Sequence, residues 1–275
     1  MNRRAMLLGP LAFFSIYALL REVRTAGAEI DGRLSAKKWI ARQNDLARGL
    51  RKGSISQIAW HDEMARLARE VDVAQLMAEI KRSHLSDGGE PFMHDPKKRN
   101  VVLLDDAGQR LRVPYGAALF SFTPKNVITP HAHKHMASAH MVLEGKVRIR
   151  TFDRLADEEG ALVIRPTADH VAGVGDAAAM TTARDNIHWF APRSDTAMTF
   201  DVIVSHLDPG QQDFEIQPID PRGAGASGWV NPRAASELRG VDAAVFCGPL
   251  NWSAAEVKPF RSQANFAVST RSLPP

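Results

Sequence analysis

Residues 130–145 read PHAHKHMASAHMVLEG, and this stretch decides the fold and the site that the sequence predicts. Ten consecutive residues of this stretch contain four of the chain's ten histidines, which are His131, His133, His135 and His140. Side chains two residues apart point to the same face of a β-strand. His131 and His133 can therefore chelate one metal ion from one strand, whereas His135 is expected on the turn that follows.

A later segment supplies a third imidazole. His188 lies in the sequence NIHWF at residues 186–190, which is predicted to form another strand. Inward positions of a small closed barrel face a common enclosed space, so His188 can reach the same ion as His131 and His133. Three neutral imidazoles leave coordination positions open for a substrate and oxygen, and imidazole suits Fe, Zn, Cu or Ni. These three histidines are the predicted metal ligands.

Short strands dominate the chain from Val101 to Leu207. Val147 and Ile149 alternate with Arg148 and Arg150, which is typical of a half-buried strand. Many short strands with regularly spaced turns favour a mainly β barrel or jelly roll. The expected strands cover residues 101–105, 111–123, 127–133, 138–152, 162–166, 178–182, 187–191 and 197–207.

The histidine stretch resembles the first motif of the cupin superfamily. It has His131-x-His133, four residues, Ser138, six residues and Gly145, although the motif normally has Glu where Ser138 stands. His188 falls where the second cupin motif places its histidine. The resemblance implies a cupin fold, which is a double-stranded β-helix or jelly-roll barrel, here with an N-terminal helical layer.

Within the cupins, residues 120–220 look most similar to the 2-aminoethanethiol dioxygenase and plant cysteine oxidase group of three-histidine thiol dioxygenases. The similarity rests on the proline before His131, the Asn-Ile-His segment and the strand Asp201-Val202-Ile203. It implies Fe(II), with another divalent metal as the alternative, held by His131, His133 and His188. It also implies that O2 is added to a small-molecule thiol or a thiol-bearing peptide, giving a sulfinate.

Two more residues are candidates for supporting the ligands. The resemblance implies that Asp201 forms hydrogen bonds near the metal. His140 has the same strand parity as Ser138, so it can point inward and orient the imidazoles or substitute for one of them. The other histidines are expected to be structural.

The sequence also departs from this group. Ala132 stands where the group usually has Asp, and residues 207–210 read LDPG where it has Pro-Pro-Tyr. Residues 213–218 loosely follow the group's closing strand, with Phe214 in place of tyrosine. A Cys–Tyr crosslink, as in the cysteine dioxygenase branch, would need Cys247 and Tyr115 and is not expected. The substrate is therefore not fixed by the family pattern.

The segment before the barrel is expected to be helical. Ser35 and Ser56 can cap two helices, and Asp72 begins an Asp-x-x-Gln capping pattern for a third. Residues 86–100 contain two glycines and two prolines and are expected to be a linker. The predicted layout is a signal or anchor at 1–28, a helical region at 29–100, the barrel at 101–220 and a loop-rich extension at 221–275.

The first 28 residues are typical of an export signal. Arg3 and Arg4 precede an apolar run at residues 6–20, and Ala26-Gly27-Ala28 offers a small-residue cleavage site. The paired arginines suggest the twin-arginine route to the periplasm. An uncleaved anchor through residues 6–20 is the alternative. The segment carries four arginines and one glutamate, which is three of the chain's four net positive charges, so no nucleic-acid partner is predicted.

Two alternatives to a thiol dioxygenase stay open at this point. One is another metal-dependent cupin enzyme, such as a lyase, an isomerase or a dioxygenase of a substrate that is not a thiol. The other is a non-enzymatic cupin that binds or senses a small ligand. The sequence does not define an oligomeric state.

Overall fold

The computed structural model describes residues 33–91, 94–158, 161–208, 210, 215–220 and 229–232 of the 275-residue chain. The predicted export signal at residues 1–28 and Cys247 lie outside the described residues. Only residues 229–232 of the predicted loop-rich extension are described, and they form a strand. No helix in the described part is long and apolar enough to cross a membrane.

Among the described residues, three helices precede the sheets, and each begins where the sequence predicts. They are α2 (Ala36–Arg51), α3 (Gln57–Glu70) and α4 (Val73–Arg82). Their N-caps are Ser35, Ser56 and Asp72, and each cap side chain accepts a hydrogen bond from the backbone N–H three residues on. Such caps satisfy N–H groups that the first helical turn leaves without a partner. The predicted helix starts are therefore confirmed.

Twelve strands follow in the described part of the chain. The first six are β1 (His84–Asp87), β2 (Lys97–Val102), β3 (Gly116–Phe122), β4 (Ile128–Lys134), β5 (Ala137–Glu144) and β6 (Val147–Glu158). The other six are β7 (Ala161–Ala172), β8 (Ala177–Met180), β9 (Ile187–Pro192), β10 (Ala197–Val204), β11 (Glu215–Asp220) and β12 (Trp229–Pro232). All strand pairs between them are antiparallel.

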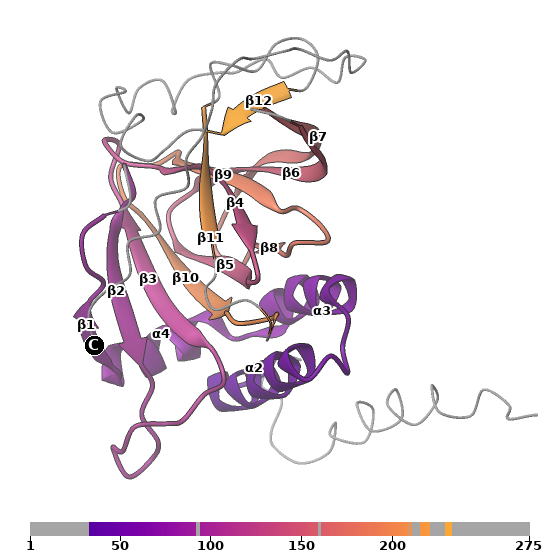
Figure 1. Ribbon diagram of the computed structural model, residues 1–275. Coiled ribbons are helices and arrows are strands. Elements are labelled where there is room, and N and C mark those ends of the chain that lie inside the picture. Colours follow the sequence, from indigo (N-terminus) through magenta and orange to yellow (C-terminus); the bar gives the residue numbers. More distant parts are fainter. Residues whose placement is uncertain are drawn as a thin grey trace, which may run out of the picture. The chain divides into compact units, whose positions relative to one another are not determined.

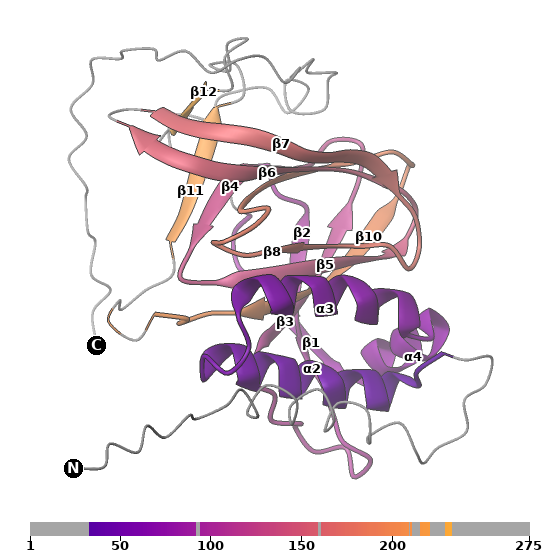
Figure 2. The same ribbon diagram turned by 90° about the vertical axis from the view of Figure 1, so that its right-hand side faces the viewer.

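The strands form two facing sheets (Figures 1 and 2). One sheet has the order β1-β2-β3-β10-β5-β8. The other has β4-β9-β6-β7, and β11 and β12 join its two outer strands into a closed ring. Successive strands from β3 to β10 therefore alternate between the sheets, except that β6 and β7 are neighbours in the second sheet. This strand order is that of an eight-stranded jelly roll, so the predicted fold class is confirmed.

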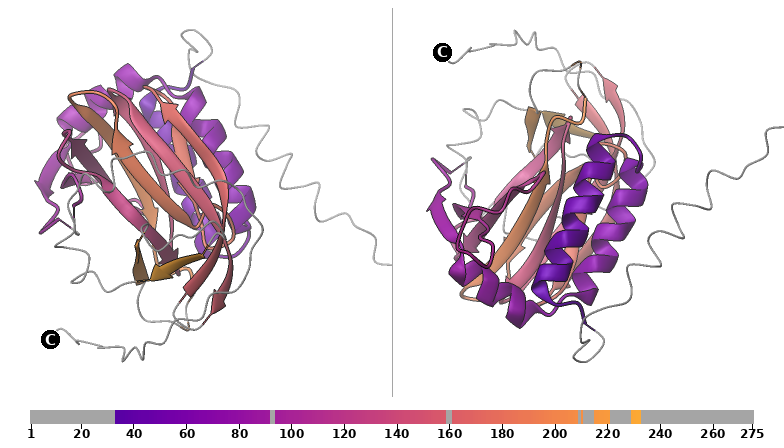
Figure 3. Two further views of the ribbon diagram at one scale, coloured as in Figure 1. Left: turned by 90° about the horizontal axis from the view of Figure 1, so that it is seen from above. Right: turned by 90° about the horizontal axis from the view of Figure 1, so that it is seen from below.

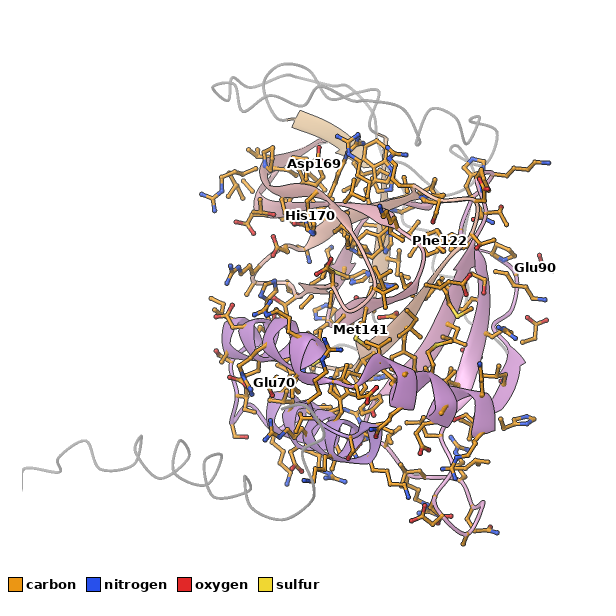
Figure 4. All side chains as sticks on the ribbon, turned by 180° about the vertical axis from the view of Figure 1, so that it is seen from behind. Glu70, Glu90, Phe122, Met141, Asp169 and His170 are labelled. Atoms are coloured by element: carbon orange, nitrogen blue, oxygen red, sulfur yellow. The ribbon has the colours of Figure 1, made fainter. Side chains whose placement is uncertain are left out.

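The helices cover the outer face of the first sheet (Figure 3). Met141 of β5 and Phe200 of β10 point to that face and pack in one cluster with Trp39 and Trp60 from the helices. Met141 is labelled in Figure 4, above the helices. Because side chains alternate along a strand, the neighbouring residues of β5 and β10 point the other way, into the space between the sheets. The helices thus pack only on the outer face of the first sheet, and its inner face can carry polar residues.

Two predicted boundaries are wrong. Residues 86–100 are not a linker throughout, because β1 and β2 lie partly within them. Their sequences are mostly polar and lack the hydrophobic alternation of an inner strand, since β1 lies at the edge of the sheet and β2 lies next to it. The expected strand 138–152 is two strands, β5 and β6, which are separated by a turn at Gly145 with a φ of 70°. A glycine adopts this left-handed conformation without strain.

Gly145 provides a test of how tightly this turn is packed. A Cβ added there would collide with the backbone oxygen of Thr196, whereas at Gly108, with a similar φ of 74°, it would meet nothing within 4 Å. Gly108→Ala is expected to cost about 1–2 kcal/mol from backbone strain alone. Gly145→Ala is expected to cost about 2–5 kcal/mol, because steric overlap adds to the strain. Urea denaturation of both variants measures the two losses in the free energy of unfolding. Equal losses would contradict the steric overlap at Gly145.

Candidate metal centre

The three predicted ligands lie together between the sheets. His131 and His133 are two residues apart on β4, and His188 of β9 is paired directly opposite His131. The ring centroids are 4.1 Å apart for His131 and His188, 4.7 Å for His133 and His188, and 4.8 Å for His131 and His133. Ligand atoms from all three lie within 4.8 Å of one another. Strand period and strand pairing thus bring together the side chains that the sequence predicts.

An irregularity in β4 sets the position of the first ligand. The pairing of β4 with β9 shifts by one residue between Ile128 and His131, which is the segment containing Pro130. Proline has no N–H for a sheet ladder and is therefore common at bulges. Beside it, His131 Nδ1 lies 2.7 Å from the backbone oxygen of Thr129. Because a carbonyl oxygen only accepts, Nδ1 must carry the proton and Nε2 the lone pair.

The nitrogen positions suit a cation. His131 Nε2 lies 2.9 Å from His133 Nε2. Since His131 Nε2 carries a lone pair, its short distance to His133 Nε2 is favourable only with a proton or a cation between the two nitrogens. His133 Nδ1 is buried and has no hydrogen-bond partner among the described residues. A metal ion bound by the three rings would accept the ring-nitrogen lone pairs that otherwise face one another in the site. Imidazole is a common ligand of divalent transition metals.

Burial keeps these imidazoles neutral. It lowers the pKa of His131 from 6.5 to about 4, and it lowers the pKa values of His133 and His188 well below 6.5. Charge on the neighbouring histidines lowers the pKa values of His133 and His188 further. A neutral imidazole is the form that binds metal, so the site holds its ligands ready at neutral pH.

His140 and Asp201 face the ligands from the other sheet. The pairing of β5 with β10 places them directly opposite each other, and His140 Nε2 lies 3.5 Å from an Asp201 carboxyl oxygen. Burial lowers the pKa of His140 to about 3 and raises the pKa of Asp201 to about 8. Both groups are therefore mainly neutral at pH 7. The His140 ring centroid lies 6.0 Å from that of His188, so the inward orientation expected for His140 is observed.

A cavity of about 150 Å³ lies between the three predicted ligands and the pair of His140 and Asp201. All three predicted ligands line it, and so do His140, Asp201 and Ser138. Ser138 is buried where the cupin motif has Glu, and the only metal-binding cluster found among the described residues contains no carboxylate. Ligand pockets for drug-sized molecules are about 300–1,000 Å3, so this cavity suits a smaller ligand.

Sequence reasoning missed three charged residues of the cavity, Glu90, Asp95 and Lys98. They come from residues 86–100, which were expected to be a linker, and Lys98 lies on β2. Only the pairing of this segment with the barrel, for example through the hydrogen bond from the Val127 N–H to the His94 oxygen, brings them to the site. No local pattern in the sequence could have indicated this.

Other predicted residues lie away from the cavity. His135 occupies the turn between β4 and β5 with a φ of 58°, as expected. Tyr115 packs in the cluster under the helices and is not among the residues that line the cavity.

The helical layer is tied to the third ligand through the turn before β9. His61 of α3 lies with Nε2 2.8 Å from an Asp185 carboxyl oxygen, and Arg184 donates to Asp62 of the same helix at 2.8 Å. The next residue, Asn186, donates its side-chain N–H to the backbone oxygen of His133 at 2.6 Å. The turn at residues 184–186 therefore contacts both α3 and β4, and His188 follows it two residues later on β9.

No protein-family model and no curated protein matches this chain. Solved structures give partial matches. A sugar phosphate isomerase from a cupin superfamily, from Silicibacter pomeroyi, is 24% identical with a TM-score of 0.27, over 38% of this chain and 57% of that one. The fold is a jelly roll, and this conclusion rests on the strand order alone.

Two further structures match over part of their length. KdgF from Halomonas sp. is 16% identical with a TM-score of 0.30, over 45% of this chain and 86% of that one. A vicilin from Solanum melongena is 12% identical with a TM-score of 0.29, over 38% of this chain and 26% of that one. The matched region is thus only about a quarter of the vicilin and just over half of the isomerase. These similarities concern the fold and not the activity.

The lowered pKa values predict how the imidazoles titrate. His131 and His140 are expected to stay neutral from pH 8 down to pH 5, because their pKa values lie at about 4 and about 3. Nitrogen-15 NMR of the metal-free protein reports the protonation state of each ring. Neutral-ring signals should persist at pH 5, and midpoints near the ordinary value of 6.5 would contradict the burial of the site.

Proposed function

We propose that this protein is an Fe(II)-dependent thiol dioxygenase-like oxidoreductase, which adds O2 to a small thiol or a thiol-bearing peptide. The observation that carries the proposal is a buried face of three neutral imidazoles, without a carboxylate, on a small cavity. A bound Fe(II) would supply sites for a thiolate and for O2, so that both oxygen atoms can be transferred to sulfur to give a sulfinate.

The chain's own residues would orient and enclose the reactants. The Thr129 carbonyl fixes the His131 ring with Nε2 toward the site, and the cavity holds only a small ligand. Buried Phe120 and Ile128 form apolar parts of the wall, which limits the access of water. Exclusion of water strengthens electrostatic interactions and protects reactive species from side reactions.

A second candidate is a metal-dependent isomerase or lyase. It is favoured by the neutral Asp201 carboxyl beside the neutral His140 imidazole, since the first can donate a proton and the second can accept one. Addition of O2 to a thiol does not need such a pair. A third possibility, a cupin that only binds a ligand, requires no turnover with any substrate.

Metal content is the first test. The purified protein is expected to bind about one Fe(II) or other divalent ion per chain, and His188→Ala is expected to lose most of it. The matched control is His170→Ala, because His170 is exposed on β7 and is not among the residues that line the cavity. Elemental analysis of the two variants measures the difference. Equal metal content in His188→Ala and the parent would contradict the assigned ligands.

Oxygen consumption tests the reaction. The Fe(II)-loaded protein is expected to consume O2 with cysteamine, with cysteine or with a peptide that has an N-terminal cysteine. Mass spectrometry should find a product that has gained two oxygen atoms, and His188→Ala should produce none. Absence of a sulfinate with every thiol would overturn the dioxygenase proposal and leave the isomerase or lyase as the next candidate.

The cellular location is part of the same proposal. We expect export to the periplasm through residues 1–28, as the paired arginines suggest, with a membrane anchor through residues 6–20 as the alternative. Export of a folded protein would allow the metal to be inserted before the chain leaves the cytoplasm.

A further inference from the structure

Asp185, three residues before the third ligand, has a backbone conformation that needs support. Its φ is 51°, in the left-handed region, and among the described residues only His135 and His206 are other non-glycine residues with a positive φ. Aspartate tolerates this region better than most residues, but the conformation still costs free energy. Strain of this kind persists where surrounding contacts hold it in place, and it often lies near a functional site.

The contacts that hold Asp185 come from three elements. Its carboxyl group lies 2.8 Å from His61 Nε2 of α3 and accepts a hydrogen bond from Thr167 Oγ1 of β7. Its backbone N–H donates to the Asp153 carboxyl group of β6 at 2.9 Å. Burial raises the pKa of Asp185, but the hydrogen bonds from His61 and Thr167 outweigh burial, so the pKa is lowered overall. Because an ionised carboxylate only accepts, His61 donates to it from Nε2.

Asn186 extends this support to both ligand strands. Its buried side chain donates to the backbone oxygen of His133 on β4 at 2.6 Å. Its backbone oxygen faces the imidazole of His188 on β9 and raises the pKa of that ring, although His188 Nδ1 has no hydrogen-bond partner among the described residues. A rotation of the backbone at Asp185 would therefore move a group that contacts each of these two ligand residues.

We propose that His61 and Asp185 form a positioning pair, through which the helical layer holds the third metal ligand in place. Neither residue lines the cavity, so the pair acts through Asn186 and touches neither the metal nor the substrate. The inference rests on the metal centre of the proposed function and does not depend on the reaction that follows.

Asp185→Gly removes the pair while it preserves the turn. Glycine adopts a positive φ without strain, so the turn can still close when the carboxylate contact with His61 is lost. The Zn(II) affinity, measured by competition with a chelator, is expected to fall about tenfold or more, as is common when a residue that supports a ligand is removed. The visible absorption of the Co(II)-loaded protein should also change, because it reports the geometry of the ligands.

The matched control is His206→Gly. It relaxes another positive φ, of 59°, at an exposed residue that does not line the cavity. Neither the Zn(II) affinity nor the Co(II) absorption should change in this variant. Thermal unfolding of the metal-free proteins distinguishes a loss of affinity from a loss of the fold.

Two substitutions of His61 separate hydrogen bonding from packing. His61→Gln places an amide N–H near the position of Nε2 and can still donate to Asp185, so it should keep the parent's Zn(II) affinity and Co(II) absorption. His61→Leu fills similar space without a donor and should weaken Zn(II) binding, by a smaller factor than Asp185→Gly because Thr167 still holds the carboxylate. In the double variant, His61→Leu should add nothing to the loss in Asp185→Gly, since the two residues act as one pair.

Unchanged Zn(II) affinity and Co(II) absorption in Asp185→Gly would overturn the positioning pair, and so would an equal loss in His206→Gly. Additive losses in the double variant would contradict it as well. If Asp185→Gly does not fold, the two His61 variants decide, and equal affinities in them would overturn the pair. Failure of the proposed reaction is a separate result. If the Fe(II) protein forms no sulfinate but Asp185→Gly binds Zn(II) weakly, the dioxygenase proposal fails and the positioning pair stands.

Discussion

The pairing of His131 on β4 with His188 on β9 is the contact on which the site depends. These residues are far apart in the chain, and only the return of β9 beside β4 places them opposite each other. The bulge at Pro130 sets the register, and the Thr129 carbonyl sets the orientation of the His131 ring. With the pairing fixed, His133 is added by the two-residue period of the same strand. A one-residue slip would turn both β4 histidines to the other face of the sheet.

Burial has opposite effects on the two kinds of titratable group around the cavity. It lowers the pKa values of the histidines and raises those of Asp95 and Asp201, because in each case it disfavours the charged form. At neutral pH the histidines of the cavity are thus uncharged, and Asp95 and Asp201 are mainly protonated. A divalent ion would be the largest charge present, and it would shift the pKa values of the groups nearest to it.

The sequence predicted the metal centre better than the substrate side of the cavity. His131, His133 and His188 could be found because a strand period and a motif spacing are local properties. The helix starts at Ser35, Ser56 and Asp72 followed from capping residues, which are also local. Asp95 and Lys98 have no such pattern, since they reach the cavity only through the fold. The turn at Gly145 was missed because hydrophobic residues continue on both sides of it.

The turn that joins α3 to the ligand strands has a consequence for engineering. His61 and Asp62 contact residues 184 and 185, and Asn186 contacts the His133 backbone just before the chain reaches His188. The helices are therefore not an independent addition to the barrel. A graft of the bare barrel onto another protein would leave the turn before β9 without its contacts to α3, so helices and barrel should be transplanted together.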